Sequence, residues 1–583
     1  MNPEHPPLPK ILAAVPLVFR GVRADYTHIS WTASDKFLSA FVGQWVFGEW
    51  LLEKWNEPKA TLAWARLPML LLTLALGWAV FVYARRLGGK WGGLLCLSVY
   101  VSTPAFLAFG PLVHTDLAVT LFSLVTLWTF AEMWQEPKGK NALLFELSLA
   151  GALLSKFTGG ILFVVFVAFA LSLRWRAVPG QPRSKPELRQ WRRDRRWATL
   201  KGIMWAVVTV YLFYFVFSWH QSTRVLERIG TGPAALLLRR LLMAPLLYLG
   251  GVLWVVLSGR RGTFLLGHAY PHGVWFYFPV VFALKSALGF LGLLLLAALV
   301  GIGKKVRAQM STAVIPAKLM VHWRVLWVSL LIFTGVCLLS PLDISIRHFS
   351  VPILLLILLL APLPRMLGDL KGRFLAMAGA ATVAMLAVGC LFTAVNAYPY
   401  YFPYVNALSL GRPTYALVND SNVDWNQSLG EVRRFAEQHG LQKIAFDQYG
   451  FSDVTVSVPQ ARPWNCQTPT QEDAGQWVTV SAPNLLEARN CVWLLEYSHE
   501  ALAGGSIYAV RLPPQIPVAG SAGGPPLPSA YRAFGGLPFE TRGLFSHVIQ
   551  NPDDLPRAVE WMQTTFTNGS KPPAQPLKPP WER

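Results

Sequence analysis

The chain has 583 residues, of which 53% are hydrophobic and only 14% are charged. This composition excludes a disordered or fibrous protein, and a soluble globular chain of this length normally carries more charge. Uncharged apolar segments such as 67–84, 203–219 and 374–395 reach or approach the length needed to cross a bilayer. The sequence therefore predicts an α-helical polytopic membrane protein.

The first 65 residues contain an apolar run at 8–19 that is too short to span a bilayer, followed by a Trp-rich stretch. We expect them to form an external segment with juxtamembrane helices. Residues 66–396 form the predicted transmembrane domain, with about ten spans. These lie near 67–84, 91–109, 117–134, 142–156, 158–173, 203–219, 275–303, 325–340, 350–363 and 374–396. Residues 220–273 are then a long external loop.

The net charge of +21 comes from 52 Lys and Arg against 31 Asp and Glu. The basic residues gather after the first, fifth, seventh and ninth predicted spans, in the segments 85–86, 174–201, 304–307 and 365–373. Such a distribution indicates the cytoplasmic side of the membrane and contact with anionic lipid headgroups, so nucleic-acid binding is not expected. The remaining loops and the tail then face the exterior. We expect the plasma membrane of a bacterium, with the site and the tail on the periplasmic or outer side.

The tail differs in composition from the spans. Residues 397–515 predict an extracytoplasmic α/β domain, with a helix at 429–439 and strands at 443–447, 477–481, 492–496 and 506–510. Residues 516–583 are rich in Pro and Gly and are expected to be partly disordered. Cys466 and Cys491 could form a disulfide if this domain lies outside the cytoplasm.

Ionisable residues recur in the connections predicted to be external. A charge at membrane depth costs about 2.5–3.5 kcal/mol on insertion scales, so each such residue needs a partner or a wet cavity. Lys285 alone is explained equally well by snorkelling to the interface, His114 by solvation in a turn, and Asp116 by capping a helix N-terminus. Arg347 beside His348 favours an anion site, because a guanidinium presents a fork suited to phosphate. All of these ionisable residues are predicted to face the exterior side of the membrane, and this common location favours a single site. The candidate members are Glu4, His5, His114, Asp116, Lys156, His268, Lys285, Arg347 and His348.

The five cysteines form no metal-ligand pattern, and the sequence contains no glycine-rich phosphate loop and no nucleophile elbow. We therefore expect no cofactor. A divalent metal is possible but is not indicated by the sequence.

Several short motifs occur in a familiar order. These are Glu4-His5-Pro6-Pro7-Leu8, Arg66-Leu67-Pro68, His114-Thr115-Asp116, Leu154-Ser155-Lys156-Phe157, Trp275-Phe276-Tyr277-Phe278 with Lys285, Ile346-Arg347-His348, and Asp420-Ser421-Asn422-Val423-Asp424-Trp425-Asn426-Gln427. Over residues 4–510 the chain resembles the lipid-carrier-dependent glycosyltransferases of family 39, which include protein O-mannosyltransferases and aminoarabinose transferases and have the GT-C fold.

The resemblance implies transfer of a sugar from a polyprenyl-phosphate carrier to an acceptor, which the sequence does not identify, on the non-cytoplasmic face. Glu4 and His5 would line the site, Asp116 would be the second acidic position, and Lys156, Arg347 and His348 would bind the carrier phosphate. A carboxylate within reach of a hydroxyl acts as a general base, and a cation stabilises the leaving phosphate.

The family also has a first span and an acidic pair upstream of the His-Pro-Pro segment, and this sequence has neither. We expect the natural start to lie upstream of Met1. Two alternatives stay open. The first is an inactive relative that binds the carrier lipid, and the second is a transporter, although no repeated half is visible in the sequence.

Overall fold

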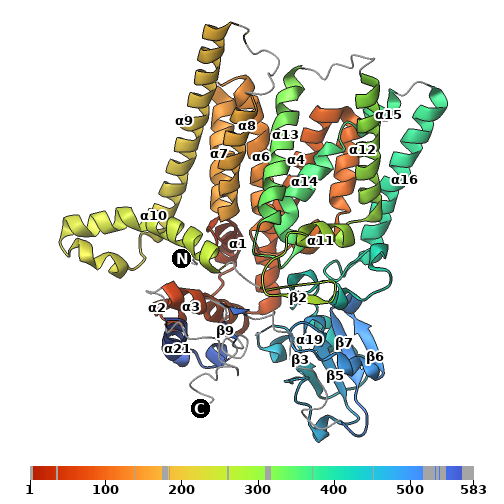
Figure 1. Cartoon of the computed structure of the whole chain (residues 1–583). Helices are drawn as coiled ribbons and strands as arrows, with labels where there is room; N and C mark the ends of the chain where they lie inside the picture. The colour runs from red at the N-terminus through yellow and green to blue at the C-terminus, as the bar shows by residue number, and fades with distance from the viewer. Residues whose placement is uncertain are drawn as a thin grey trace.

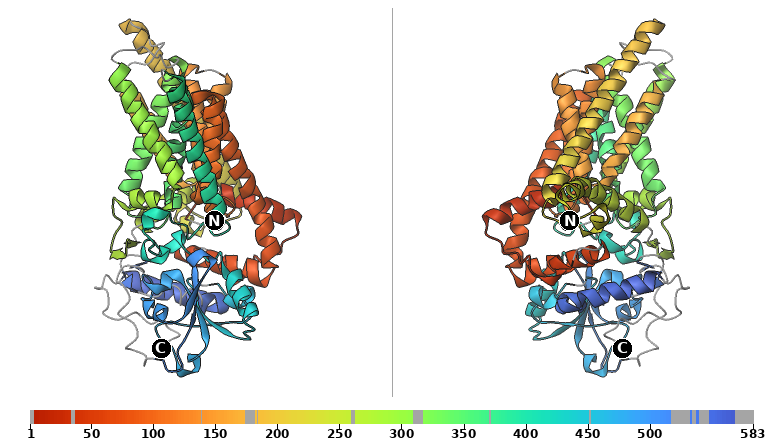
Figure 2. Two further views of the ribbon diagram at one scale, coloured as in Figure 1. Left: turned by 90° about the vertical axis from the view of Figure 1, so that its right-hand side faces the viewer. Right: turned by 90° about the vertical axis from the view of Figure 1, so that its left-hand side faces the viewer.

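The structure is a computed structural model, and it describes residues 4–33, 37–137, 139–173, 182, 184–258, 262–308, 317–369, 372–450, 452–516, 532–533, 537–538 and 547–567. Long helices stand side by side, and a smaller α/β domain lies at one end of them (Figure 1). The two side views in Figure 2 show the same two layers, with the N-terminal helices beside the α/β domain. The predicted class, a helical polytopic membrane protein with a C-terminal α/β domain, is confirmed.

Each of the ten predicted spans falls on helical segments. Seven helices in the described ranges are long and apolar enough to cross a membrane, or eight when one bent pair is counted as a single span. The helices that correspond to the predicted spans are α4 (Pro58–Val101), α5 (Pro104–Phe109), α6 (Asp116–Gln135), α7 (Gly139–Ser155), α8 (Ile161–Ser172), α9 (Lys185–Ser218), α11 (Tyr277–Lys285), α12 (Leu288–Ala308), α13 (Ala317–Leu338), α14 (Ser350–Leu359), α15 (Leu363–Gly368) and α16 (Arg373–Ala397).

Helix α4 contains the first two predicted spans, because it reverses direction within its length. The Tyr100 hydroxyl donates a hydrogen bond to the Thr73 carbonyl at 2.8 Å. In a straight helix, these residues would be about 40 Å apart at 1.5 Å per residue. The reversal occurs at Gly89, whose φ of 82° is a conformation that glycine adopts without strain. The two legs, 58–88 and 90–101, are therefore antiparallel neighbours.

The predicted loop at 220–273 is wrong over much of its length, because it contains a long helix, α10 (Pro233–Ser258). The helix is apolar enough to span a membrane, but it runs across the foot of the other helices (Figure 1). Arg240 donates to the Gln221 carbonyl at 2.7 Å, and Arg239 donates to the Glu227 carbonyl at 3.4 Å. These two charged side chains tie the first half of α10 to the segment that follows α9. A two-stranded hairpin follows, formed by β1 (Thr263–Leu265) and β2 (His268–Tyr270).

The predicted span at 275–303 is a bent pair instead of one helix. Helices α11 and α12 meet at 114° across a short break. Asn406, from the segment after α16, donates its side-chain amide to the Ala283 carbonyl at 2.6 Å and to the Ser286 carbonyl at 2.7 Å. The carbonyls freed by the break therefore have partners, as a helix end within the membrane region requires.

The C-terminal domain is built on a five-stranded sheet with the order β4-β3-β5-β7-β6. Its central strand β5 pairs in parallel with β3 and antiparallel with β7. The elements are α17 (Leu429–Gln438), β3 (Ile444–Asp447), α18 (Val454–Ser457), β4 (Ala461–Pro463), β5 (Trp477–Ser481), α19 (Ala482–Leu485), β6 (His499–Leu502) and β7 (Ile507–Arg511). The predicted strand at 492–496 is wrong. This segment is a 3₁₀ helix, and a short apolar run does not distinguish the two structures by periodicity.

Distant parts of the chain pack together beside this domain. The N-terminal elements are α1 (Leu8–Phe19), α2 (Ile29–Thr32), α3 (Phe37–Glu49) and a π-helical turn (Trp50–Lys54). Helix α21 (Leu555–Thr567) lies in the tail predicted to be partly disordered, and it packs on α3 through a cluster that includes Val42, Val46, Leu555, Ala558 and Met562. Two further short strands, β8 (Arg532–Ala533) and β9 (Leu537–Pro538), pair with each other.

Candidate functional site

A buried carboxylate surrounded by cations and imidazoles lies at the end of the helices that carries the C-terminal domain. The Lys156 ammonium nitrogen is 2.6 Å from Asp116 Oδ1 and 3.5 Å from His348 Nδ1. His114 Nδ1 is 3.2 Å from Asp116 Oδ2, and Arg347 Nε is 4.0 Å from the same oxygen. Asp116 and Lys156 are only 6% and 7% exposed. We call these five residues the Asp116 cluster.

Three breaks between helices supply the cluster. Asp116 is the first residue of α6, where a negative charge interacts favourably with the helix dipole, and its backbone N–H donates to His114 Nδ1 at 3.0 Å. Lys156 is an extended residue between α7 and a 3₁₀ turn that leads into α8. Arg347 and His348 lie in the 3₁₀ turn 346–349 that precedes α14. Because each break occurs at the same end of the helices, residues distant in the sequence meet there.

The Arg347 guanidinium is held between aromatic rings. Its central carbon lies 4.1 Å from the centre of the Trp425 ring and 5.8 Å from that of Phe109. Trp425 belongs to the segment between α16 and the C-terminal sheet, so that segment reaches the cluster. Trp425 was not among the predicted site residues. The polar motif 420–427 was the signal in the sequence that could have pointed to it.

The N-terminal segment approaches the cluster through His5. Burial lowers the pKa of His5 to about 3, and the charges of Lys156, Lys10 and Arg347 act in the same direction. His5 is therefore neutral at physiological pH and lies within electrostatic reach of the cluster. Glu4 accepts a hydrogen bond from the Gln44 side chain at 2.9 Å, and the structure does not show it in contact with Asp116.

Like Glu4 and His5, the predicted site residues Lys285 and His268 are not members of the cluster. The Lys285 ammonium group donates to the carbonyls of Phe402, Tyr404 and Asn422 at 2.6, 3.1 and 2.8 Å. A lysine with three backbone acceptors ties elements together, and neither snorkelling nor contact with the cluster describes it. His268 is exposed on β2 and, among the described residues, makes no hydrogen bond or ion pair with the cluster.

Two imidazole nitrogens in the cluster have unused hydrogen-bonding capacity. Within the described part of the chain, His114 Nε2 and His348 Nε2 are buried without a hydrogen-bond partner. Burial also lowers the pKa of His114, which favours its neutral form. Nearly all buried polar groups in proteins are paired with protein, water or ligand, so these nitrogens indicate a polar occupant of the site. One carboxylate, a lysine, an arginine and neutral imidazoles form a donor-rich set suited to a phosphate.

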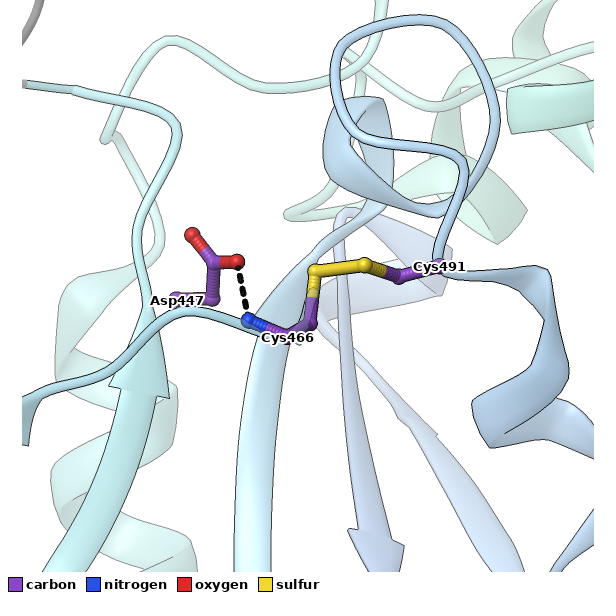
Figure 3. Close-up of side chains that lie close together, drawn as sticks. All are labelled: Asp447, Cys466 and Cys491. Carbon is purple, nitrogen blue, oxygen red and sulfur yellow. Dashed lines mark hydrogen bonds between the residues drawn. A yellow bond between two sulfur atoms is a disulfide. The ribbon is translucent and has the colours of Figure 1, made fainter. Parts of the chain in front are cut away.

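A second close group, Asp447 with Cys466 and Cys491, is structural. The two sulfurs are joined in a disulfide, as considered from the sequence (Figure 3). Although the sulfurs and a carboxylate oxygen lie within 4.8 Å of one another, both thiols are consumed by this bond. Asp447 accepts from the Cys466 backbone N–H at 2.9 Å and lies 3.2 Å from Arg489 Nε. The carboxylate therefore anchors the disulfide loop to the end of β3.

Comparison with known proteins finds a family model that matches part of the chain. Residues 58–180 match the family described as dolichyl-phosphate-mannose-protein mannosyltransferase. This match confirms the family resemblance. The matched segment contains three members of the Asp116 cluster, namely His114, Asp116 and Lys156.

Two solved structures are similar over most of their length. ArnT from Cupriavidus metallidurans in the apo state is 12% identical with a TM-score of 0.39, and the match covers 86% of this chain and 97% of that chain. ArnT from the same organism bound to undecaprenyl phosphate is 14% identical with a TM-score of 0.38, covering 88% and 99%. Both likenesses are distant. The comparison with curated proteins finds no match.

Proposed function

We propose that this chain is a membrane glycosyltransferase that takes a sugar from a polyprenyl-phosphate carrier. The observation that carries the proposal is the Asp116 cluster, with Lys156 and Arg347 held around a buried carboxylate. Two cations at one site neutralise the charge on a phosphate, and the unpaired nitrogens of His114 and His348 offer further hydrogen bonds to its oxygens. The family match over residues 58–180 supports a sugar transferase.

Each group in the Asp116 cluster that takes part in the proposed reaction has a separate role. The acceptor hydroxyl attacks the anomeric carbon, the bond from that carbon to the carrier phosphate breaks, and the bonding electrons go to the phosphate oxygen. Lys156 and Arg347 stabilise the charge that develops there. Asp116 is the carboxylate within the cluster and accepts the hydroxyl proton in this scheme. Glu4, the other predicted catalytic residue, accepts a hydrogen bond from the Gln44 side chain and is given no role in this scheme.

The proposed side of the membrane is the non-cytoplasmic one. Arg86 pairs with Glu132 at 2.6 Å and Arg195 donates to the Trp134 carbonyl at 2.7 Å, so both basic residues lie near the last turn of α6, the end of that helix opposite Asp116. Positive charge at this end is expected for the cytoplasmic side. The disulfide between Cys466 and Cys491 supports an oxidising compartment for the C-terminal domain. Anionic lipids and a hydroxyl-bearing acceptor of unidentified nature are the expected partners, and the plasma membrane of a bacterium is the expected location.

The test is a transfer assay with purified protein in liposomes and a panel of undecaprenyl-phosphate sugars, with release of undecaprenyl phosphate as the readout. The wild-type protein is expected to consume at least one donor, and Arg347→Ala is expected to abolish consumption. Arg365→Ala is a matched control, because Arg365 lies toward the other end of the same span, Ile346–Gly368. Equal activity of Arg347→Ala and wild type would remove Arg347 from the site.

A second candidate is carrier-lipid binding without transfer. The contacts of Asp116 favour this candidate. Lys156 contacts one carboxylate oxygen and His114 contacts the other, so the carboxylate is poorly placed to accept a proton from an acceptor hydroxyl. Tight binding of undecaprenyl phosphate together with no consumption of any donor in the panel would support this candidate over the transferase.

A further inference from the structure

The segment 419–427 meets the turn that carries Arg347 and His348. Asn422 is fully buried there, and its side-chain oxygen accepts a hydrogen bond from the Ile346 N–H at 3.0 Å. Its side-chain amide donates to the Tyr277 hydroxyl at 2.9 Å and to the Ile344 carbonyl at 3.3 Å. One carboxamide therefore binds the backbone on both sides of Ser345, immediately before Arg347.

Lys285 holds the same segment from the other direction. Its ammonium group donates to the Asn422 carbonyl at 2.8 Å and to the Phe402 carbonyl at 2.6 Å. The side chain starts from the last residue of α11, so the segment is fastened to the bent helix pair as well as to the Arg347 turn. Charged donors make stronger hydrogen bonds than neutral ones, and burial of all three groups strengthens them further.

Trp425 also links the segment 419–427 to Arg347, and side-chain hydrogen bonds fix the backbone around it. The Trp425 N–H donates to the Gln427 side chain at 2.6 Å, and the following residue, Asn426, has a left-handed φ of 59° and donates its N–H to Asp424 Oδ1 at 2.9 Å. The indole lies 4.1 Å from the Arg347 guanidinium carbon and is 43% exposed. An indole stacks on the face of a guanidinium, whereas phosphate oxygens bind its N–H edge, so the two interactions are compatible.

We propose that the segment 419–427 is a positioning element for Arg347, in which Asn422 fixes the backbone of the turn and Trp425 orients the guanidinium. This inference rests on the proposed function, because it assigns the segment to the binding of the carrier phosphate. The C-terminal domain is then part of the site. Lys285, predicted to bind substrate, acts here as a support for Asn422.

The test compares Trp425→Leu, which removes the aromatic face, with Trp425→Phe, which keeps a smaller one. Affinity for undecaprenyl phosphate is measured on the purified full chain in nanodiscs. We expect Trp425→Leu to weaken binding about three- to ten-fold, within the range for cation–π pairs, and Trp425→Phe to weaken it less. Trp275→Leu is the matched control, because Trp275 is also exposed and makes an edge-to-face contact with Phe276 instead of a contact with Arg347.

A double-mutant cycle separates positioning from general structural damage. If Trp425 acts through the guanidinium plane, Trp425→Leu should change affinity less than two-fold in an Arg347→Lys background, because an ammonium group has no plane to orient. The same loss in both backgrounds would overturn the proposal.

A second measurement needs no carrier lipid. Phenylglyoxal modification of Arg347, followed by peptide mass spectrometry, should accelerate in Trp425→Leu and stay unchanged in Trp275→Leu. An unchanged rate in Trp425→Leu would refute the contact itself. Failure of the wild-type protein to bind undecaprenyl phosphate would instead refute the proposed function, and the modification rates would still decide whether Trp425 contacts Arg347.

Discussion

Replacing Asp116 by Asn should destabilise the free protein and make it more responsive to a phosphate ligand. The substitution keeps the size of the side chain but leaves Lys156, 2.6 Å away, as an uncompensated cation in a site where both residues are more than nine-tenths buried. Breaking a buried ion pair by removing one partner reduces the free energy of unfolding by about 3–5 kcal/mol. The same change removes a negative charge that repels phosphate, so the affinity for undecaprenyl phosphate should rise.

The assay is chemical unfolding in detergent with and without undecaprenyl phosphate. At a ligand concentration 100 times the Kd, binding adds about 2.7 kcal/mol to wild-type stability, and every tenfold gain in affinity adds about 1.4 kcal/mol more for Asp116→Asn. Glu431→Gln is the control, because Glu431 is only partly buried and pairs with Arg434, whose side chain is exposed, so that losing this pair should cost about 0–1 kcal/mol. Equal stability of Asp116→Asn and wild type, or equal stabilisation by the ligand, would refute the reasoning.

Three further outcomes are expected. Lys285→Met should lower the free energy of unfolding by about 2–4 kcal/mol in the same unfolding assay, because it leaves three buried carbonyls without a donor; a loss below 1 kcal/mol would contradict this. Reducing the disulfide between Cys466 and Cys491, which are 25 residues apart, should destabilise the C-terminal domain by about 3.5 kcal/mol in unfolding with and without dithiothreitol, and Cys337→Ser should have no comparable effect. Burial raises the pKa of Asp424 to about 6 from 3.8, so the folded state keeps a proton that the unfolded state has lost, and stability should fall as pH rises from about 4 to 6. Asp424→Asn should abolish that slope in melting curves recorded across this range, and a retained slope would exclude Asp424 as its source.

The sequence predicted the helical framework well, because long apolar runs and basic connections are local signals. The spans at 117–134 and 374–396 correspond closely to α6 and α16. The helix α10 was missed because Arg239 and Arg240 interrupt its apolar pattern, whereas in the structure their side chains bind carbonyls of the preceding segment. The bend between α11 and α12 depends on Asn406, which is more than 100 residues away in the sequence and is invisible to any local pattern.

The candidate site was predicted in part. His114, Asp116, Lys156, Arg347 and His348 meet because helix breaks at one end of a bundle are neighbours whatever their separation in the sequence. The same reasoning grouped Lys285 with these residues, whereas its ammonium group binds three carbonyls outside the Asp116 cluster, because topology gives the side of the membrane and not the distance between residues on that side. Trp425 could not be selected, because an aromatic residue in a polar segment has many possible partners and only the folded chain shows that it stacks on Arg347.

Helix α21 packs on α3, although the two helices are far apart in the sequence. Beside this contact, the Trp50 indole donates a hydrogen bond to the Ile549 carbonyl, 499 positions away. During synthesis, the side of α3 that carries Val42 and Val46 therefore lacks its α21 partner until residues 555–567 have emerged. A chain interrupted before α21 would expose this apolar surface to chaperones and proteases, so the docking of α21 on α3 protects both helices only after the C-terminal domain between them has been synthesised.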